Sequence, residues 1–183
     1  MKRYRISSET DFYYSTCTIT AWLPVFQDER YFQVIIESLK YCQQFKGLYL
    51  LGYVIMPTHL HLITSNSEKT SLSDIMRDFR HYTSSHIRKL LESDQRHGFL
   101  KIMQKAASIL PGQTVKVWKD DFHPVTLFSE KWFYQKLEYL HENPVRKGFV
   151  EYAEHWKYSS ARNWEKNDDR VIRIDRDALF LED

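Results

Sequence analysis

The sequence is poor in glycine, proline and cysteine, and neither sign of charge is in large excess. Five glycines and five prolines among 183 residues exclude a collagen-like or low-complexity chain. The two cysteines, Cys17 and Cys42, are far apart and fit no metal-ligand spacing, so we interpret both as buried thiols of a reduced compartment. The formal net charge of +2 by itself indicates no particular partner.

Long hydrophobic runs are also missing. No run reaches the roughly 18 apolar residues of a membrane span. The first residues, "MKRYRISSETDF", contain no apolar stretch typical of a secretory signal. We therefore expect a cytoplasmic protein with no membrane contact. Hydrophobic residues still make up 43% of the chain and aromatic residues 15%, which suits a folded core and also stacking on unpaired bases.

Hydrophobic periodicity predicts an α+β fold with a mainly antiparallel sheet, because strands alternate with helices and two strands adjoin as a hairpin. One domain over residues 1–165 and a polar C-terminal tail over 166–183 are expected. A fourth strand is expected at "VKVW", an irregular loop at "DDFHPVTLF", and a loop at "LPGQT" after an ambiguous segment from residue 98. The other predicted strands span 13–22, 48–56 and 59–64, and the predicted helices span 28–46, about 25 residues from the capping box at 71–74, and 129–142.

Positive charge gathers in one stretch of the chain. Between Arg77 and Lys105 there are seven basic and three acidic side chains. Such a face attracts a polyanion, and it is also typical of a solvated helix surface. The basic residues off the apolar stripe of this helix are Arg77, Arg80, Arg88 and Lys89.

The stretch "YVIMPTHLHLI" at 53–63 places two histidines in an apolar strand. Alternate side chains of a strand share a face, so His59 and His61 point to one side while Leu60 and Leu62 point into the core. Two such imidazoles can converge on one divalent ion, although half-exposed strand histidines without a role are common. A structural zinc site wants about four nitrogen or sulfur ligands, so an open Mg²⁺ or Mn²⁺ site with a third ligand from elsewhere fits better.

The helix predicted at 129–142 carries Tyr139 off its apolar stripe, and Asn143 follows one turn later. As structural residues, Tyr139 would pack beside Trp132, and Asn143 would end the helix before Pro144. As functional residues, the tyrosine would attack a phosphodiester that a divalent ion has polarised, and the amide oxygen of Asn143 would complete the ion's coordination.

Four motifs together resemble a known family. "VIMPTHLHL", "VWKDDFHP", "YLHENPVRKGFV" and "WKYSS" occur in this order between Tyr53 and Ser160. The combination resembles the REP-associated tyrosine transposases, relatives of the insertion-sequence single-tyrosine transposases of the HUH nuclease class. The resemblance covers more than half of the chain.

The resemblance implies a ferredoxin-like or RRM-like antiparallel sheet flanked by helices. It implies an enzyme that cleaves and rejoins single-stranded DNA beside imperfect hairpins, with a 5′-phosphotyrosine intermediate and a divalent metal, in the nucleoid. By position, His59 and His61 would bind the metal, Tyr139 would be the nucleophile and Asn143 the third ligand, where relatives often have Gln. Thr58 replaces Asn or Glu of relatives, which should matter little because its side chain points away from the ion.

Several alternatives stay open at this stage. Tyr134 and Tyr82 compete as nucleophiles but lack the "HENP" context. The protein could instead be a catalytically silent, domesticated binder of DNA hairpins, or a metal-dependent nucleic-acid hydrolase without a covalent intermediate. Relatives act as homodimers or as monomers, and the sequence does not distinguish these states.

Overall fold

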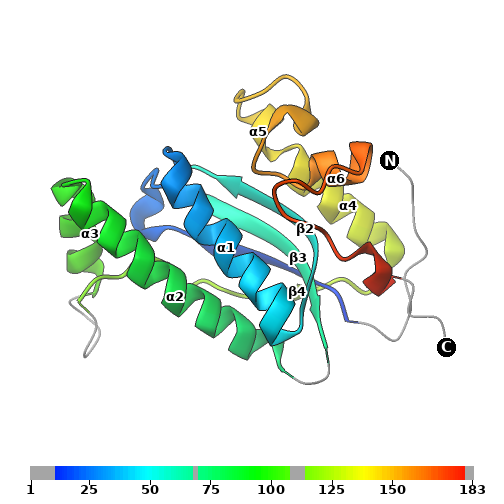
Figure 1. Ribbon diagram of the computed structural model, residues 1–183, viewed down its shortest axis with the longest axis horizontal. Helices are drawn as coiled ribbons and strands as arrows, with labels where there is room; N and C mark the ends of the chain where they lie inside the picture. Colours follow the sequence, from blue (N-terminus) through cyan, green and yellow to red (C-terminus); the bar gives the residue numbers. More distant parts are fainter. Residues whose placement is uncertain (1–10, 68–69, 108–113, 180–183) are drawn as a thin grey trace.

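A four-stranded antiparallel sheet forms the centre of the computed structural model, which describes residues 11–67, 70–107 and 114–179 (Figure 1). Its strand order is β2-β3-β1-β4. With α1 and α2 between the strands, this is the βαββαβ order of a ferredoxin-like sheet. The expected α+β fold is therefore confirmed. The strands are β1 (Tyr13–Thr18), β2 (Leu48–Met56), β3 (His59–Asn66) and β4 (Val125–Thr126).

Helices α1 (Glu29–Lys46) and α2 (Leu72–Ser93) begin where the capping residues predict. The side chains of Asp28 and Ser71 accept hydrogen bonds from the first-turn backbone, and Gly47 ends α1 with a left-handed φ of 72°. The ambiguous segment is helical as α3 (His97–Ala107), while the loop predicted after it lies outside the described residues except for Thr114. The remaining elements are α4 (Glu130–His141), α5 (Asn143–Arg146), α6 (Ala161–Lys166), η1 (Thr20–Trp22), η2 (Ala153–His155) and η3 (Arg176–Leu179).

Two strand predictions need correction. The first strand ends at Thr18 rather than at residue 22, because Ala21 and Trp22 both have φ of 55° and form the turn η1. The segment "VKVW" makes only a bridge between Trp118 and Ile19, and the fourth strand lies in the stretch predicted to be an irregular loop. Residues 117–119 and 125–127 both make backbone hydrogen bonds or bridges to the segment that contains β1, so either part was a candidate for the fourth strand.

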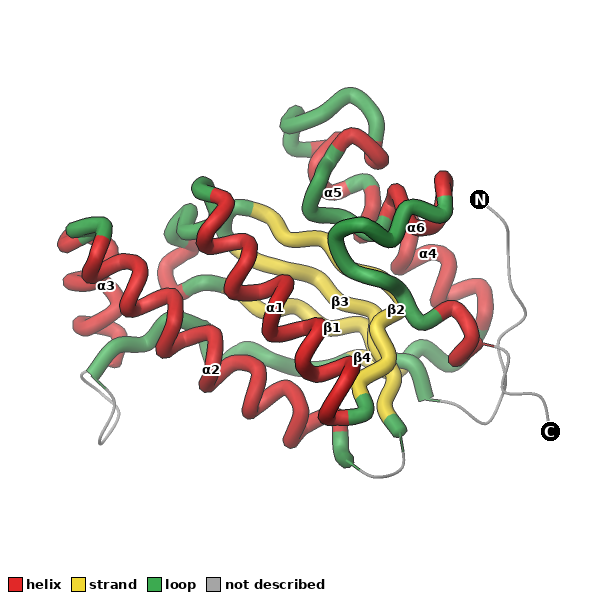
Figure 2. The backbone as a smooth tube through the Cα atoms, in the orientation of Figure 1, coloured by secondary structure: helices red, strands yellow, loops and turns green. Residues whose placement is uncertain are grey.

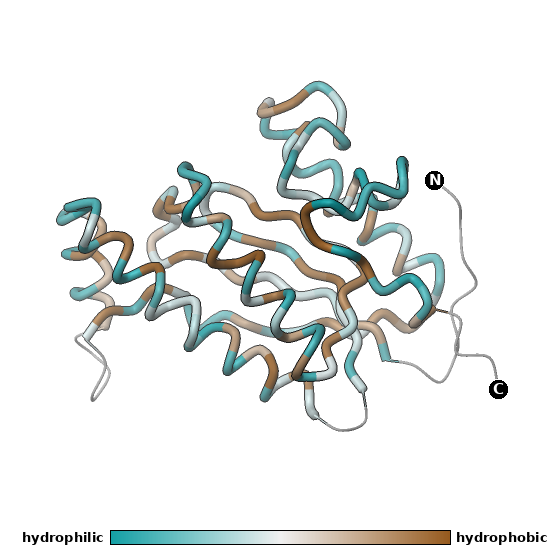
Figure 3. The backbone as a smooth tube through the Cα atoms, viewed as in Figure 1, coloured by the Kyte–Doolittle hydropathy of each residue, from teal (hydrophilic) through white to brown (hydrophobic). Residues whose placement is uncertain are grey.

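The two faces of the sheet have different coverings. Register places Leu60, Leu62 and Cys17 on one face, where α1 and α2 lie side by side (Figure 2). His59 and His61 lie on the other face, against which α4 packs. Hydrophobic segments run along the strands between these layers (Figure 3). None of the described helices combines the length and hydrophobicity needed to cross a membrane.

The outer edge of β2 is covered by the C-terminal part of the chain. Backbone N–H groups of Ile55, Ser160 and Asp175 donate to carbonyls of Tyr158, Tyr53 and Leu50 respectively, at 2.8–2.9 Å. Covering an edge in this way satisfies its backbone groups. Within the segment expected to be a polar tail, the described residues bury three apolar side chains in the same core: Ile172, Ile174 and Leu179.

Candidate active site

His59 and His61 lie together at the start of β3, and both are largely buried, with 8% and 7% of their surface exposed. Their ring centroids are 4.8 Å apart. Pro57 and Thr58 form the hairpin turn between β2 and β3, directly before the histidines and at the end of the sheet. The two rings therefore lie together on one face of the sheet, as the alternation of the strand predicts.

Hydroxyl groups hold one nitrogen of each ring. Thr58 Oγ1 lies 2.9 Å from Nδ1 of His59. Tyr14 Oη and Thr16 Oγ1 each lie 2.8 Å from Nδ1 of His61. An imidazole whose Nδ1–H donates to a hydroxyl keeps its lone pair on Nε2, the usual arrangement of a metal-binding histidine. Thr58 was expected to matter little, but it orients one of the two rings.

Both histidines are neutral at pH 7. Burial lowers the pKa of His59 to about 4, with a further contribution from Lys147. Burial also lowers the pKa of His61 to about 3, and His59, Arg146 and Lys136 add to the shift. A neutral imidazole is the form that binds a metal ion, and the surrounding cations disfavour its protonated form.

Tyr139 projects from α4 toward the histidine pair. Its ring lies 5.9 Å from that of His61 and 6.4 Å from that of Tyr14. Tyr139 is 42% exposed, so the residue is accessible from solvent. Trp132, the packing partner expected in the structural interpretation, instead contacts Phe128.

The two competing tyrosines lie elsewhere. Tyr134 is buried against Phe133 and Trp164. Tyr82 stacks on His86 of α2, across the sheet from the histidines. Among the three candidate tyrosines, Tyr139 is thus the one that contacts the histidine pair.

Two cations flank Tyr139 that the sequence analysis missed. The Arg146 guanidinium lies 4.1 Å from the ring centroid of Tyr139, and Nζ of Lys136 lies 5.7 Å from it. Arg146 also donates to the backbone carbonyl of Tyr139 at 2.9 Å. Lys136 precedes the tyrosine by three residues on one helix, a spacing that places both on the same side. That spacing was the available signal for Lys136, whereas Arg146 arrives through the turn into α5.

Asn143 is buried at the start of α5. Its Nδ2 donates to the carbonyl of Tyr139 at 2.9 Å. The bond joins the third predicted ligand to the helix that carries the predicted nucleophile. With the amide nitrogen held in this way, the amide oxygen is the atom that can serve as a ligand.

The position of α4 depends on a glycine and on a buried hydrogen-bond chain. A Cβ at Gly52 of β2 would lie 2.9 Å from Cδ1 of Leu137, so the helix approaches the sheet closely there. Ser160 Oγ accepts from the Tyr53 backbone and lies 2.9 Å from Nε2 of His141, whose burial lowers its pKa to about 3. The histidine of "YLHENP" and the last serine of "WKYSS" therefore fix α4 to β2.

The structure does not bring the basic residues of α2 to this site. Arg77 pairs with Asp74 at 2.5 Å, and Arg88 with Glu92 at 3.4 Å. Lys89 is exposed on the same helix. Arg80 donates to the backbone carbonyl of Lys119, and it thereby supports a segment that reaches the histidine side.

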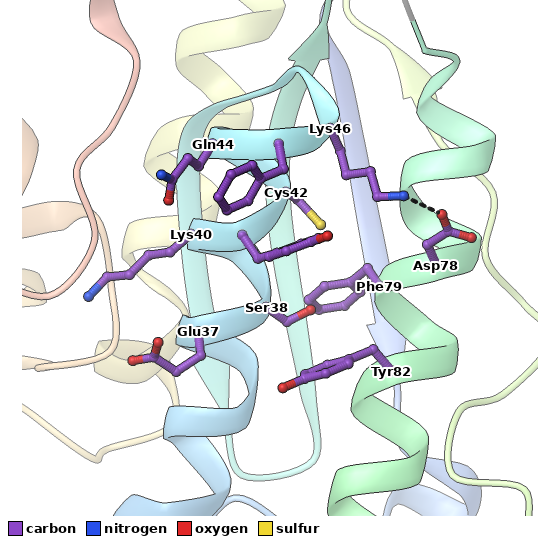
Figure 4. A pocket seen from close by; sticks show the side chains of 11 residues that line it. Glu37, Ser38, Lys40, Cys42, Gln44, Lys46, Asp78, Phe79 and Tyr82 are labelled. Atoms are coloured by element: carbon purple, nitrogen blue, oxygen red, sulfur yellow. Dashed lines mark hydrogen bonds and ion pairs between the residues drawn. The ribbon is translucent and has the colours of Figure 1, made fainter.

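A groove lies between α1 and α2 (Figure 4), and these helices cover the face of the sheet opposite the histidines. Cys42, Phe79 and Tyr82 line it, and Lys46 pairs with Asp78 at its rim at 3.0 Å. None of its lining residues belongs to the predicted site. The groove between α1 and α2 is therefore separate from the candidate active site.

The fold is shared with a solved transposase. A solved REP-associated tyrosine transposase bound to a REP hairpin aligns with 100% of this chain and 93% of its own, with a TM-score of 0.61 and 14% identity. A putative transposase from Deinococcus radiodurans R1 aligns with 78% of this chain and 97% of its own, with a TM-score of 0.47 and 16% identity.

The sequence itself supports the same relationship. Residues 17–103 match the family model described as "Transposase IS200 like". No curated protein matches the chain. The predicted resemblance to the IS200-like, single-tyrosine transposases is thereby confirmed. The matched part contains His59 and His61, whereas Tyr139 and Asn143 lie beyond it.

Proposed function

We propose that the protein is a transposase that nicks and rejoins single-stranded DNA beside hairpins, with Tyr139 as the nucleophile and a divalent metal as cofactor. The observation that carries the proposal is the convergence of Tyr139 on the oriented pair His59 and His61. The transposase family match and the fold support a DNA substrate.

The reaction is an exchange of phosphodiester bonds. The Tyr139 oxygen attacks phosphorus and loses its proton, while the bond from phosphorus to the 3′ oxygen breaks. The products are a 5′-phosphotyrosine and a 3′ oxygen, which takes up a proton to become a free 3′-OH. Attack of a 3′-OH on the phosphotyrosine reverses these steps and rejoins the strand.

His59, His61 and Asn143 would hold the metal ion. The fit rests on the two imidazoles, whose Nδ1 atoms are engaged by hydroxyls and whose neutral state is favoured by burial. Two imidazoles with an amide oxygen suit Mn²⁺ or Mg²⁺ better than a closed zinc site. When bound, the ion would withdraw charge from a non-bridging phosphate oxygen.

Lys136 and Arg146 would attract the phosphate to Tyr139. Their charges lie beside the tyrosine ring, where a phosphate would approach its hydroxyl. The residues Arg77, Arg80, Arg88 and Lys89 of α2 would contact only DNA that extends across the opposite face of the molecule. A solved relative in the fold comparison holds a REP hairpin, and we propose the same class of palindromic DNA for this protein.

A denaturing gel tests the proposal. The protein is incubated with Mg²⁺ or Mn²⁺ and a labelled hairpin oligonucleotide that has single-stranded tails. We expect a covalent protein–DNA adduct that requires metal and is lost in Tyr139→Phe. Cleavage without an adduct would indicate a hydrolase, and a native-gel shift without cleavage would indicate a silent hairpin-binding protein.

A further inference from the structure

Trp22 is an exposed aromatic ring beside the histidine pair. Its ring centroid lies 5.5 Å from that of His59, at an interplanar angle of 73°. The side chain is 54% exposed. Among the described rings that contact His59 or His61, Trp22 and Tyr139 are the ones that remain exposed.

The backbone fixes Trp22 in an unusual conformation. Both Ala21 and Trp22 have φ of 55°, a left-handed region that bulky residues rarely adopt. The turn is held because the Trp22 N–H donates to the Ile19 carbonyl at 2.9 Å and the Thr20 N–H to the Val117 carbonyl at 2.8 Å. The fold thus holds the ring at the surface in a set position, although its apolar faces would gain from burial.

A cation accompanies the ring. Nζ of Lys119 lies over Trp22, 5.5 Å from the ring centroid, and it pairs with Asp121 at 3.0 Å. Arg80 of α2 donates a hydrogen bond to the backbone carbonyl of Lys119. An aromatic face together with a lysine is the combination by which proteins bind unpaired nucleotides, through base stacking and phosphate contact.

We propose that Trp22 stacks on one unpaired base of the DNA strand, at a nucleotide next to the phosphate that Tyr139 attacks, and that Lys119 contacts the backbone of that nucleotide. The inference rests on the proposed function for the position of that phosphate. Lys136 and Arg146 lie on the α4 side of the histidines and Lys119 on the η1 side. The strand therefore meets positive charge on both sides of the metal site.

Stacking predicts little preference for the identity of the base, because every base has a π face. The role of Trp22 is then to fix the position of the strand over the site. Sequence choice would come from the hairpin and from other contacts.

Binding to base-deleted DNA tests the proposal. In the Tyr139→Phe background, which prevents cleavage, affinity is measured by fluorescence anisotropy for a tailed hairpin oligonucleotide and for a series in which each tail nucleotide in turn is abasic. With Trp22 present, one abasic position should weaken binding by about 5- to 150-fold, the range for loss of one stacked base. With Trp22→Ala, the same abasic position should cause no further loss.

Three variants control the measurement. Trp22→Gly also removes the ring but suits the left-handed backbone, so it should lose the same base dependence without loss of folding. Tyr41→Ala removes an equally exposed ring on α1, at 54%, and should keep the abasic profile. Trp132→Ala removes a half-exposed ring at the start of α4. A profile that stays intact in both Trp22 variants overturns the proposal, and one that changes only in Trp132→Ala assigns stacking to α4 instead.

The adduct assay on the unmodified protein separates this inference from the proposed function. An adduct with an unchanged abasic profile in both Trp22 variants refutes only the role of Trp22. Loss of the base dependence in those variants without an adduct from the unmodified protein supports stacking and refutes the proposed tyrosine transposase.

Discussion

The ring of Tyr139 lies 5.9 Å from the ring of His61 in the same chain. If these two residues act as nucleophile and metal ligand, as proposed, the site needs no second subunit to complete it. We therefore predict catalysis in cis. Mixing the inactive Tyr139→Phe protein with the inactive His59→Ala/His61→Ala protein should not restore adduct formation. Recovery of activity in the mixture would show that the tyrosine helix is exchanged between two copies.

The hydroxyls behind His61 should set metal affinity. Tyr14 and Thr16 both reach Nδ1 of His61 at 2.8 Å, so either one can hold the ring when the other is removed. Tyr14→Phe and Thr16→Val should each have a small effect, and the double variant should weaken Mn²⁺ binding by about 10- to 100-fold. Titration calorimetry measures this. Tyr13→Phe is the control, because its hydroxyl bonds Asp11; equal losses in control and double variant would contradict the prediction.

Gly52 should be needed for the position of α4. An alanine Cβ there would press on the side chain of Leu137 at 2.9 Å, and Leu137 is fully buried. We expect Gly52→Ala to reduce the free energy of unfolding by about 1–3 kcal/mol and to slow adduct formation. Urea unfolding and the gel assay measure the two effects.

Gly98→Ala is the matched control for Gly52→Ala. Its added Cβ would meet no atom within 4 Å, and it lies in α3, where alanine is the better helix former. A Gly52→Ala protein as stable and active as Gly98→Ala would show that α4 is free to shift.

Buried His141 should make the fold sensitive to acid. Its pKa is about 3 in the folded chain and near 6.5 when unfolded. Between these two pH values the unfolded chain binds more protons than the folded one. The contribution of neutral His141 to the free energy of unfolding is therefore complete above about pH 6.5 and is lost as pH falls toward 3. For this group the free energy of unfolding falls by up to about 1.4 kcal/mol for each unit of decrease in pH.

Comparison of His141→Gln with the unmodified protein isolates this effect. Urea unfolding in EDTA at about pH 7 and about pH 5 should show a smaller loss of stability for the variant. Some acid sensitivity should remain, because burial also lowers the pKa of His59 and His61. An identical pH dependence in both proteins would show that His141 is not held neutral by the fold.

The salt dependence of DNA binding distinguishes the cations beside Tyr139 from the basic residues of α2. Each phosphate contact on a single strand contributes about −0.7 to the slope of log affinity against log salt. In the Tyr139→Phe background, Lys136→Ala and Arg146→Ala should each make the slope shallower by about that amount. Arg77→Ala and Arg88→Ala should change it less, because Asp74 and Glu92 already pair with those charges. A change for Lys89→Ala with none for Arg146→Ala would place the strand on α2.

Local patterns predicted the elements that depend on local chemistry. Capping by Asp28 and Ser71 and the left-handed Gly47 defined the helix ends, and alternation defined the histidine face. The end of β1 was not predictable, because β-branched and aromatic residues continue into η1, where the backbone turns against their preference. Which half of Val117–Thr126 forms the fourth strand was decided by its fit along β1, a long-range pairing.

The sequence identified the candidate residues of the site but not the side chains that surround them. The histidine spacing and the family motifs identified His59, His61, Tyr139 and Asn143 as the candidate site. Arg146 and Trp22 were missed because their positions depend on the turn into α5 and on two left-handed residues, neither of which has a periodic signal. The charge run on α2 favoured a surface that lies across the sheet from the histidines.

The exposure of Tyr139 has an evolutionary consequence. Leu137 and His141 hold α4 against the sheet, whereas the tyrosine side chain itself is 42% exposed. Selection for a stable protein therefore protects the helix but not the proposed nucleophile, Tyr139. If Tyr139 is the nucleophile, as proposed, a single substitution at position 139 would leave a folded protein that keeps its DNA binding and loses cleavage. Under the proposed function, a lineage of such proteins would pass from a DNA-cutting enzyme to a DNA-binding protein in one mutational step.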